Sequence, residues 1–359
     1  MSTAVITAWS AVSPYGTGRE PLARALRSRT RPPESAAPEE WTAARPAETA
    51  RLVPGFDVRE ALGKAGTRGM DRLTGLTAVT ARELLGEQEG DLGTGLVLGT
   101  TAGSVQGFLE FTKASFEGDR PIDVPPSKVP NMAMNRAASA SAIRHGLKGP
   151  NSTVAAGRLS GLVALAHARR LLADGRARRV LAGSAEEYSA SRAHLTHAAY
   201  GDDVVLGEGC VLFLLEPGES ATGEPLAEVL SVHHRVAPAG DFGAVLTATV
   251  RTALTEAGVH AEDVWAALPS DAPGPAGAQE REAHRSLFGA DALDRAAPPA
   301  LLGETAAATG GFQLAALLSE PGEPGRVAVC TTTDPDGPVG CAVLRLLTDG
   351  RTTGRSDAA

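Results

Sequence analysis

The sequence predicts an α/β protein, and two observations carry this prediction. Short runs rich in β-branched residues alternate along the chain with longer segments that have the periodicity of helices. One run, DDVVLGEGCVLFLLEP, is mostly apolar with little alternation, which is typical of a strand covered on both faces. Alternation of this kind favours a sheet whose central strands are largely parallel.

The expected elements follow one another in order. Strands are expected at Ala4–Ala8, Gly95–Thr100, Ser152–Ala156, Arg179–Gly183, Val204–Leu215, Leu226–His233, Val264–Leu268, Val327–Thr332 and Gly340–Leu347. Helices are expected at Asp71–Leu85, Ser104–Phe116, Met132–His145, Ser160–Ala173, Phe242–Ala257, Gln279–Leu287 and Ala306–Leu318. The turn-rich segment PGESATGEP predicts a boundary between an N-terminal half, 1–216, and a C-terminal half, 217–359.

Composition excludes several classes of protein. A chain of 359 residues that is 43% apolar can bury a large core. Its net charge of −8 argues against nucleic acid or a membrane surface as the main partner. The three cysteines, Cys210, Cys330 and Cys341, lie in apolar segments and are expected to be buried free thiols of a cytoplasmic protein. We find no basic leader before the first apolar stretch and no apolar run of about 20 residues.

Five segments in order resemble the β-ketoacyl synthases of the thiolase superfamily. They are RGMDRLTGLTAVTARELL, GLVLGTTAGSVQGFLEF, VPNMAMNRAASASAIRHGLKGPNSTV, TVAAGRLSGLVALAHARRLLADGRARRVLAGSAEE and GEGCVLFLLEP. Together they cover most of residues 1–216, and the C-terminal half matches more weakly. The resemblance implies a thiolase-like, duplicated fold with five layers, α/β/α/β/α.

The nucleophile of that family is missing here. Its cysteine thiolate takes up the acyl chain and lies in a sharp strand-to-helix turn, within a pattern like TACSSG. Aligned on the final Ser-Gly, this chain reads AGRLSG over residues 156–161, so Arg158 takes the place of the cysteine. Because an arginine side chain stays protonated at neutral pH, it is neither a nucleophile nor a base.

The two histidines of the family are also missing. The stretch that matches HGTGT places Asp271 at the first histidine, and PALLGETAAATGG places Glu304 at the second. A glycine-rich GFGG turn is replaced by TTTDPDGPVGC. We expect Arg158 to form a charge-assisted hydrogen bond with Glu304 or Asp271 in the space of the lost catalytic set.

Loss of all three groups resembles the chain-length factors, the ketosynthase β subunits of type II polyketide synthases. These typically carry glutamine at the nucleophile position, so arginine is a departure. The resemblance implies a heterodimer with a catalytic ketosynthase, and an acyl carrier protein that binds through the complex. It also implies a role in setting polyketide or polyene chain length, as in antibiotic biosynthesis, without a cofactor or metal. The dimer would form through the strand that contains Ser152, Thr153, Val154 and Ala155.

The segment FLEFTKASF concentrates three of the eight phenylalanines within nine residues. In chain-length factors the corresponding helix lines the acyl tunnel, which makes Phe108, Phe111, Thr112 and Phe116 candidate lining residues. The alternative is that these side chains pack in the core of the chain itself, at i, i+3 spacing.

Other interpretations stay open at this stage. The chain could be an altered acyltransferase that uses Asp271 or Glu304 without a covalent nucleophile, or a scaffold that docks carrier proteins. Ser160 and His167 could suggest a hydrolase, but the spacing differs from G-x-S-x-G, and a small residue packing the turn is favoured. His194 and His197 lie at i, i+3 on an expected helix, where a solvated face is favoured over a metal site.

Overall fold

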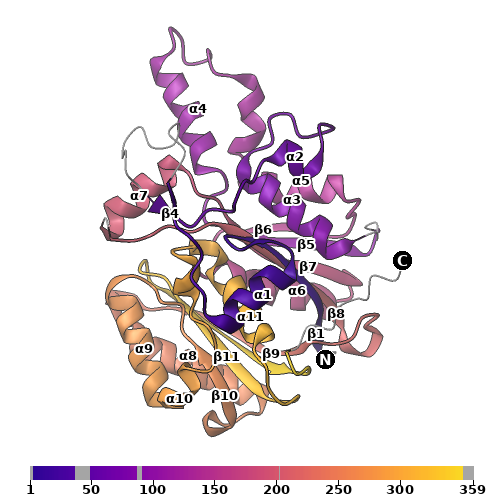
Figure 1. Ribbon diagram of the computed structural model, residues 1–359, viewed down its shortest axis with the longest axis vertical. Helices are drawn as coiled ribbons and strands as arrows, with labels where there is room; N and C mark the ends of the chain where they lie inside the picture. Colours follow the sequence, from indigo (N-terminus) through magenta and orange to yellow (C-terminus); the bar gives the residue numbers. More distant parts are fainter. Residues whose placement is uncertain (1–2, 37–48, 87–90, 202, 351–359) are drawn as a thin grey trace.

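A computed structural model describes residues 3–36, 49–86, 91–201 and 203–350 (Figure 1). Its main sheet has ten strands, nine of them in the order β10-β11-β12-β9-β1-β8-β7-β5-β6, with β2 paired to β1. The strands are β1 (Ala4–Ser13), β2 (Gly16–Thr17), β5 (Thr94–Gly99), β6 (Asn151–Val154), β7 (Arg179–Glu186), β8 (Gly209–Pro217), β9 (Ala227–Val236), β10 (Val264–Leu268), β11 (Val327–Thr333) and β12 (Pro338–Leu346). A separate short pair joins β3 (Ser35–Ala36) to β4 (Thr49–Ala50).

Helices cover both faces of this sheet. They are α1 (Arg19–Ser28), α2 (Val58–Leu62), α3 (Arg72–Leu85), α4 (Val105–Glu117), α5 (Arg136–Arg144), α6 (Ser160–Ala173), α7 (Ala190–Tyr200), α8 (Phe242–Ala257), α9 (Gly274–Phe288), α10 (Ala290–Leu293) and α11 (Thr309–Ser319). Short 3₁₀ turns include η2 (Pro126–Met132) and η7 (Ala306–Ala308).

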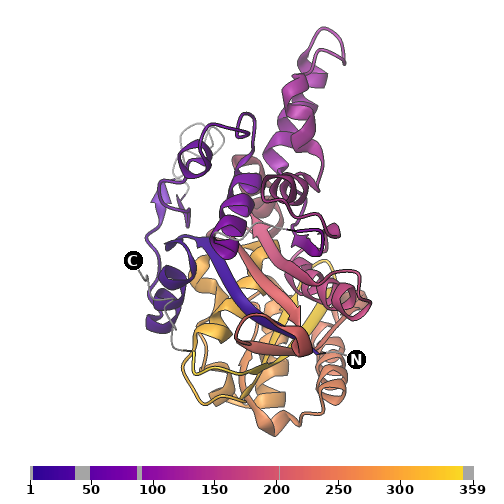
Figure 2. The ribbon, with the colours of Figure 1, turned by 90° about the vertical axis from the view of Figure 1, so that its right-hand side faces the viewer.

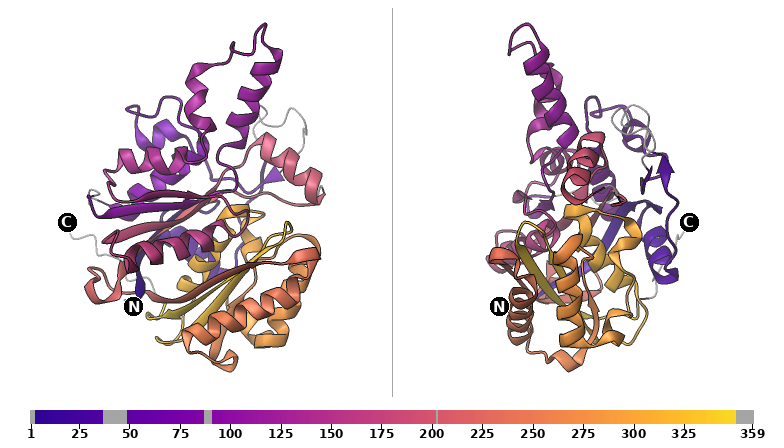
Figure 3. Two further views of the ribbon diagram at one scale, coloured as in Figure 1. Left: turned by 180° about the vertical axis from the view of Figure 1, so that it is seen from behind. Right: turned by 90° about the vertical axis from the view of Figure 1, so that its left-hand side faces the viewer.

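The layers follow the predicted order. Helices α3 and α5 cover the outer face of the N-terminal strands, and α8 and α9 cover the outer face of the C-terminal strands. Helices α6 and α11 lie between the N-terminal strands and the C-terminal strands of this sheet and contact both groups (Figures 1 and 3). Every residue of α11 is buried, which is possible because its sequence, TGGFQLAALLS, carries no charge. The predicted five-layered, thiolase-like fold is confirmed.

The prediction of largely parallel central strands was wrong. Parallel pairing joins β5 to β6, β5 to β7 and β10 to β11, whereas β9, β1 and β8 at the middle are antiparallel neighbours. The reason is that β1 links the two halves: it pairs with β8 along most of its length and with β9 over Ala4–Ile6. Sequence alternation predicts crossovers within each half but not the direction in which the halves join.

Each expected element is present, but several bounds differ: β1 continues to Ser13, α5 begins only at Arg136, and α9 begins already at Gly274. The strand expected at Val204–Leu215 begins only at Gly209, because the preceding residues cross to Glu304 through an isolated bridge at Leu206. The polar-rich helix α1 was not expected. Its buried side is narrow and consists of Leu22, Ala23 and Leu26.

Helix α4 and the turn η2 project from the body as an arm (Figures 1 and 2). No residue of α4 is buried. The side chains of Phe108 and Phe116 are 49% and 84% exposed, and those of Ile122 and Val129 farther along the arm are exposed as well. Packing of this helix in the core of its own chain was therefore the wrong alternative.

Candidate functional site

The turn that carries Arg158 connects β6 to α6. Gly157 has a φ of 55°, and a Cβ atom there would lie 2.0 Å from Oδ2 of Asp334, so only glycine is accommodated. Ser160 Oγ accepts a hydrogen bond from Ala156 N at 2.9 Å and lies 2.7 Å from the carbonyl oxygen of Gly157. These contacts fix the backbone that aims residue 158 into the protein.

Arg158 is only 5% exposed, and each of its nitrogen atoms has a partner. The guanidinium forms an ion pair with Glu304 through Nη1, donates from Nη2 to Ser270 O at 2.8 Å, and donates from Nε to Thr333 O at 3.1 Å. Its backbone N–H donates to Oδ2 of Asp334 at 2.8 Å. Of the two carboxylates expected to pair with Arg158, Glu304 forms the ion pair.

Asp271 lies beside this group but binds elsewhere. Its Oδ1 accepts from Nη1 of Arg281 at 2.6 Å, and its backbone has a φ of 53°. Burial raises the pKa of Asp271, and the charge of Arg281 opposes that shift. Glu304 is held in turn: Oε1 accepts from Ala306 N at 2.7 Å, and the Glu304 carbonyl accepts from Arg192 Nη2 at 2.6 Å.

A cavity of about 650 Å³ opens above these residues. It is lined by Arg158, Asp271 and Glu304 together with Arg31, Arg51 and Arg281 among others. None of the three cysteines lines it; all are buried, and burial raises the pKa of both Cys210 and Cys330 to about 12. The expected free, buried thiols are thus present, and none of them stands at this cavity as a nucleophile.

A buried polar network beneath Arg158 was not foreseen from the sequence. Glu280 accepts from Ser270 N at 3.0 Å, from Ser270 Oγ at 2.6 Å, and from the hydroxyls of Thr331 and Thr333 at 2.6 and 2.9 Å. Burial raises the pKa of Glu280. Since Ser270 and Thr333 also supply the two carbonyls that bind Arg158, this network fixes its acceptors.

Asp334 is the missed residue that the sequence could have revealed. It lies in the segment TTTDPDGPVGC, which stands where a glycine-rich turn was expected. An Asp-Pro-Asp-Gly sequence favours a tight turn in which the first carboxylate accepts from the backbone two residues on. Here the Asp334 carboxylate accepts from Asp336 N at 2.9 Å and from Arg158 N at 2.8 Å.

The other chemical alternatives do not assemble a site. Ser160 Oγ is buried in the turn, whereas His167 Nε2 lies 3.1 Å from Ser152 Oγ, so the two do not meet. His197 is buried against Val204 O, and His194 is exposed. Across the described ranges, we find no group of three or more His, Cys, Asp or Glu side chains that could hold a metal ion. Within the same ranges, no helix combines the length and apolarity needed to cross a membrane.

Two surfaces match the regions expected to meet a partner. Strand β6 is the last in the sheet order and pairs on one side with β5. Ser152, Thr153 and Val154 are half-buried and Ala155, just beyond the strand, is exposed. On α4, Phe108, Thr112 and Phe116 follow at intervals of four and form one row, with Phe111 beside it and half-buried.

Comparison with known proteins identifies the family. The family described as "Beta-ketoacyl synthase, N-terminal domain" matches residues 1–221. The 3-oxoacyl-(acyl-carrier-protein) synthase 2 of Vibrio cholerae is 27% identical over 253 residues, which is 60% of either chain, so the match spans little more than half of that protein. The protein of the same name from Staphylococcus aureus is 26% identical over 297 residues, 72% of this chain and 73% of that one. The chain belongs to the β-ketoacyl synthase family.

Solved structures narrow the similarity within that family. A chain of the ishigamide ketosynthase/chain length factor is 46% identical, with a TM-score of 0.92, over 96% of this chain and all of that one. A ketosynthase in complex with its type II acyl-carrier protein superposes with a TM-score of 0.77 over 96% of this chain, but at 17% identity it shows the fold alone.

Proposed function

We propose that this chain is a chain-length factor, a ketosynthase-like subunit that pairs with a catalytic ketosynthase and shapes its acyl tunnel. The observation that carries the proposal is Arg158. Where the family has its thiolate, this chain has a buried guanidinium whose three nitrogens each have an acceptor within the chain. Such a group contributes structure to the fold and no nucleophile to the reaction.

The described surface supports a partner of the same fold. An edge strand offers unpaired backbone groups, and thiolase-type dimers join through such a strand, so we place Ser152–Ala155 at the dimer seam. The row Phe108, Thr112 and Phe116 would then face the partner's acyl tunnel, with Phe111 at its edge.

The alternative of an altered acyltransferase has less support. Glu304 and Asp271, its candidate acids or bases, are each paired with an arginine. A carboxylate that is ion-paired and hydrogen-bonded is poorly suited to accept a proton from a substrate. The acyl carrier protein is proposed to bind through the complex with the ketosynthase.

Co-expression with a catalytic ketosynthase that carries an intact Cys-His-His set tests the proposal. A tag on this chain should recover a mixed complex that converts acyl and malonyl carrier proteins into a polyketide, while the chain alone turns over no thioester. Recovery of two separate homodimers would contradict the proposal. So would thioester turnover by the chain alone that is lost in Glu304→Gln.

Product length supplies the second measurement. Phe108→Ala in the mixed complex should lengthen the product, because a bulky side chain is removed from the tunnel wall. Val236→Ala is the matched control: that side chain is also an exposed apolar group, at 68%, but lies on β9. Equal products from the two variants would argue against tunnel lining by α4.

A further inference from the structure

Helix α4 has no fully buried apolar stripe. None of its residues is buried, Phe108 and Phe116 are exposed, and Phe111 is only half-buried. In a globular protein the angle of a helix about its own axis is normally set by the apolar stripe it buries. Something other than a hydrophobic core must therefore set that angle for α4.

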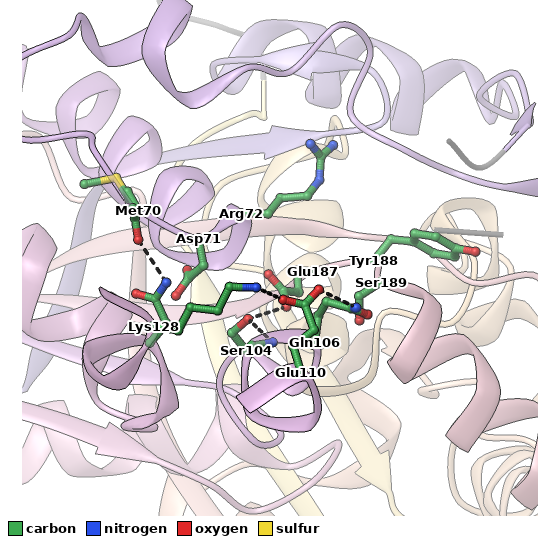
Figure 4. A pocket seen from close by; sticks show the side chains of 13 residues that line it. Met70, Asp71, Arg72, Ser104, Gln106, Glu110, Lys128, Glu187, Tyr188 and Ser189 are labelled. Atoms are coloured by element: carbon green, nitrogen blue, oxygen red, sulfur yellow. Dashed lines mark hydrogen bonds and ion pairs between the residues drawn. The ribbon is translucent and has the colours of Figure 1, made fainter. Parts of the chain in front are cut away.

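Polar side chains beneath α4 perform this task around a cavity of about 350 Å³ (Figure 4). Ser104, at the start of the helix, donates to Oε1 of Glu187 at 3.0 Å. Gln106 donates to Oε1 of Glu110 at 2.8 Å, and its own Oε1 accepts from Ser191 N at 3.1 Å. The contact with Ser191 ties α4 to the first turn of α7.

Glu110 is the residue at which these contacts meet. Its second oxygen, Oε2, forms an ion pair with Lys128 of η2, which runs alongside α4. Partial burial opposes ionisation of Glu110, but its hydrogen bonds with Lys128 and Gln106 outweigh that effect and lower its pKa. The turn η2 is anchored separately, because Asn131 Nδ2 donates to Gly69 O at 2.9 Å. Lys128 thus reaches α4 from a turn that has its own contact with the body.

The two sides of α4 are mechanically linked. Gln106 and Glu110 lie one turn apart on the side that faces the cavity, whereas Phe108, Thr112 and Phe116 form a different row. A rotation or tilt of the helix that breaks the Glu110–Lys128 pair must also move that row. The strength of a half-exposed ion pair is modest, but no buried side chain of α4 competes with it.

We infer that the Glu110–Lys128 pair, with Gln106, positions the tunnel-facing row of α4 and is thereby a determinant of product length. This inference rests on the proposed function and names positioning residues that need not contact the growing chain. The wall of the tunnel and the support of that wall would lie on opposite sides of one helix.

The test compares Lys128→Met with Lys113→Met in the mixed complex with the ketosynthase. Lys113 pairs with Glu117 on the same helix at 3.7 Å, but both side chains are largely exposed and neither lines the cavity. Lys128→Met should raise the share of products other than the main one by about two- to fivefold. Lys113→Met should leave the distribution unchanged.

A charge exchange separates positioning from general damage. Glu110→Lys alone should shift the distribution as Lys128→Met does, and adding Lys128→Glu should restore the original products by re-forming the pair. Failure of the double variant to restore them, or an unchanged distribution in Lys128→Met, would overturn the inference. Phe108→Ala keeps the two proposals apart: if it changes the products and Lys128→Met does not, the positioning role fails and the chain-length role stands.

Discussion

The Arg158 site and the α4 arm differ in which side chains they bury and which they expose. At Arg158, charge is buried at the base of a cavity, and each guanidinium nitrogen has an acceptor within the chain. On α4, apolar side chains are exposed and polar side chains face the body. The difference indicates that the place of catalysis has become internal structure, while the surface suited to a partner has been left open.

Removing the buried charge should have the largest effect on stability. Arg158→Ala leaves Glu304 buried without its partner and should lower the free energy of unfolding by about 3–5 kcal/mol. Urea denaturation of the purified protein measures this. Arg281→Gln is the control, since Arg281 is 45% exposed in its pair with Asp271 and its loss should cost no more than about 1 kcal/mol. Equal midpoints for Arg158→Ala and the unaltered chain would mean that the site is not structural.

Glu187, at the base of the arm, should produce an effect that is spread over several pH units and is smaller than that of Arg158→Ala within any one of them. Burial, and then the charge of Asp71, raise the pKa of Glu187 to about 8 from an ordinary value of 4.5. The folded state therefore binds a proton that the unfolded state releases, and stability falls as pH rises from about 4.5 to about 8.

Glu187→Gln, which mimics the protonated acid, should remove this dependence. Relative to the variant, the unaltered chain should lose up to about 1.4 kcal/mol per pH unit within that window and no more above it. Denaturation midpoints at pH 5, 6.5 and 8 measure the difference. Glu117→Gln, at an exposed carboxylate on α4, serves as control, and parallel profiles for Glu187→Gln and the unaltered chain would contradict the expectation.

The smallest effect on stability should come from the outer face of α4. Phe116 is 84% exposed, so Phe116→Asp should change the free energy of unfolding of the chain alone by less than about 0.5 kcal/mol. The same change should sharply reduce recovery of the mixed complex in size-exclusion chromatography, because it places a charge on the proposed interface. A complex that forms as readily as before would remove α4 from that interface.

Much of the fold could be predicted from the sequence because its elements are locally encoded. Glycine turns, β-branched runs and helical periodicity place most strands and helices near their observed bounds. The antiparallel centre could not be predicted, since the pairing of β1 with β8 and β9 joins residues that lie about 200 positions apart. Whether such distant strands pair parallel or antiparallel depends on how the two halves of the chain pack against each other.

Part of the site could also be predicted, because it too is encoded in short local motifs. The turn motif identifies Arg158 directly, and bringing the matched motifs together predicts Glu304 or Asp271 as its partner, of which the structure shows Glu304. Sequence order gave no means to assign Asp271 to Arg281, or to place Glu280 beneath Ser270 and Thr333. On α4, helical periodicity marks an apolar face but does not distinguish a core from an interface.

The central position of β1 has a consequence for synthesis of the protein. This strand precedes its main partners, β8 and β9, whose residues begin at Gly209 and Ala227. An apolar strand of ten residues must therefore remain unpaired with them until about 200 further residues have been synthesised. Long-range pairing of this kind slows folding, so the middle of the sheet should be among the last regions to close.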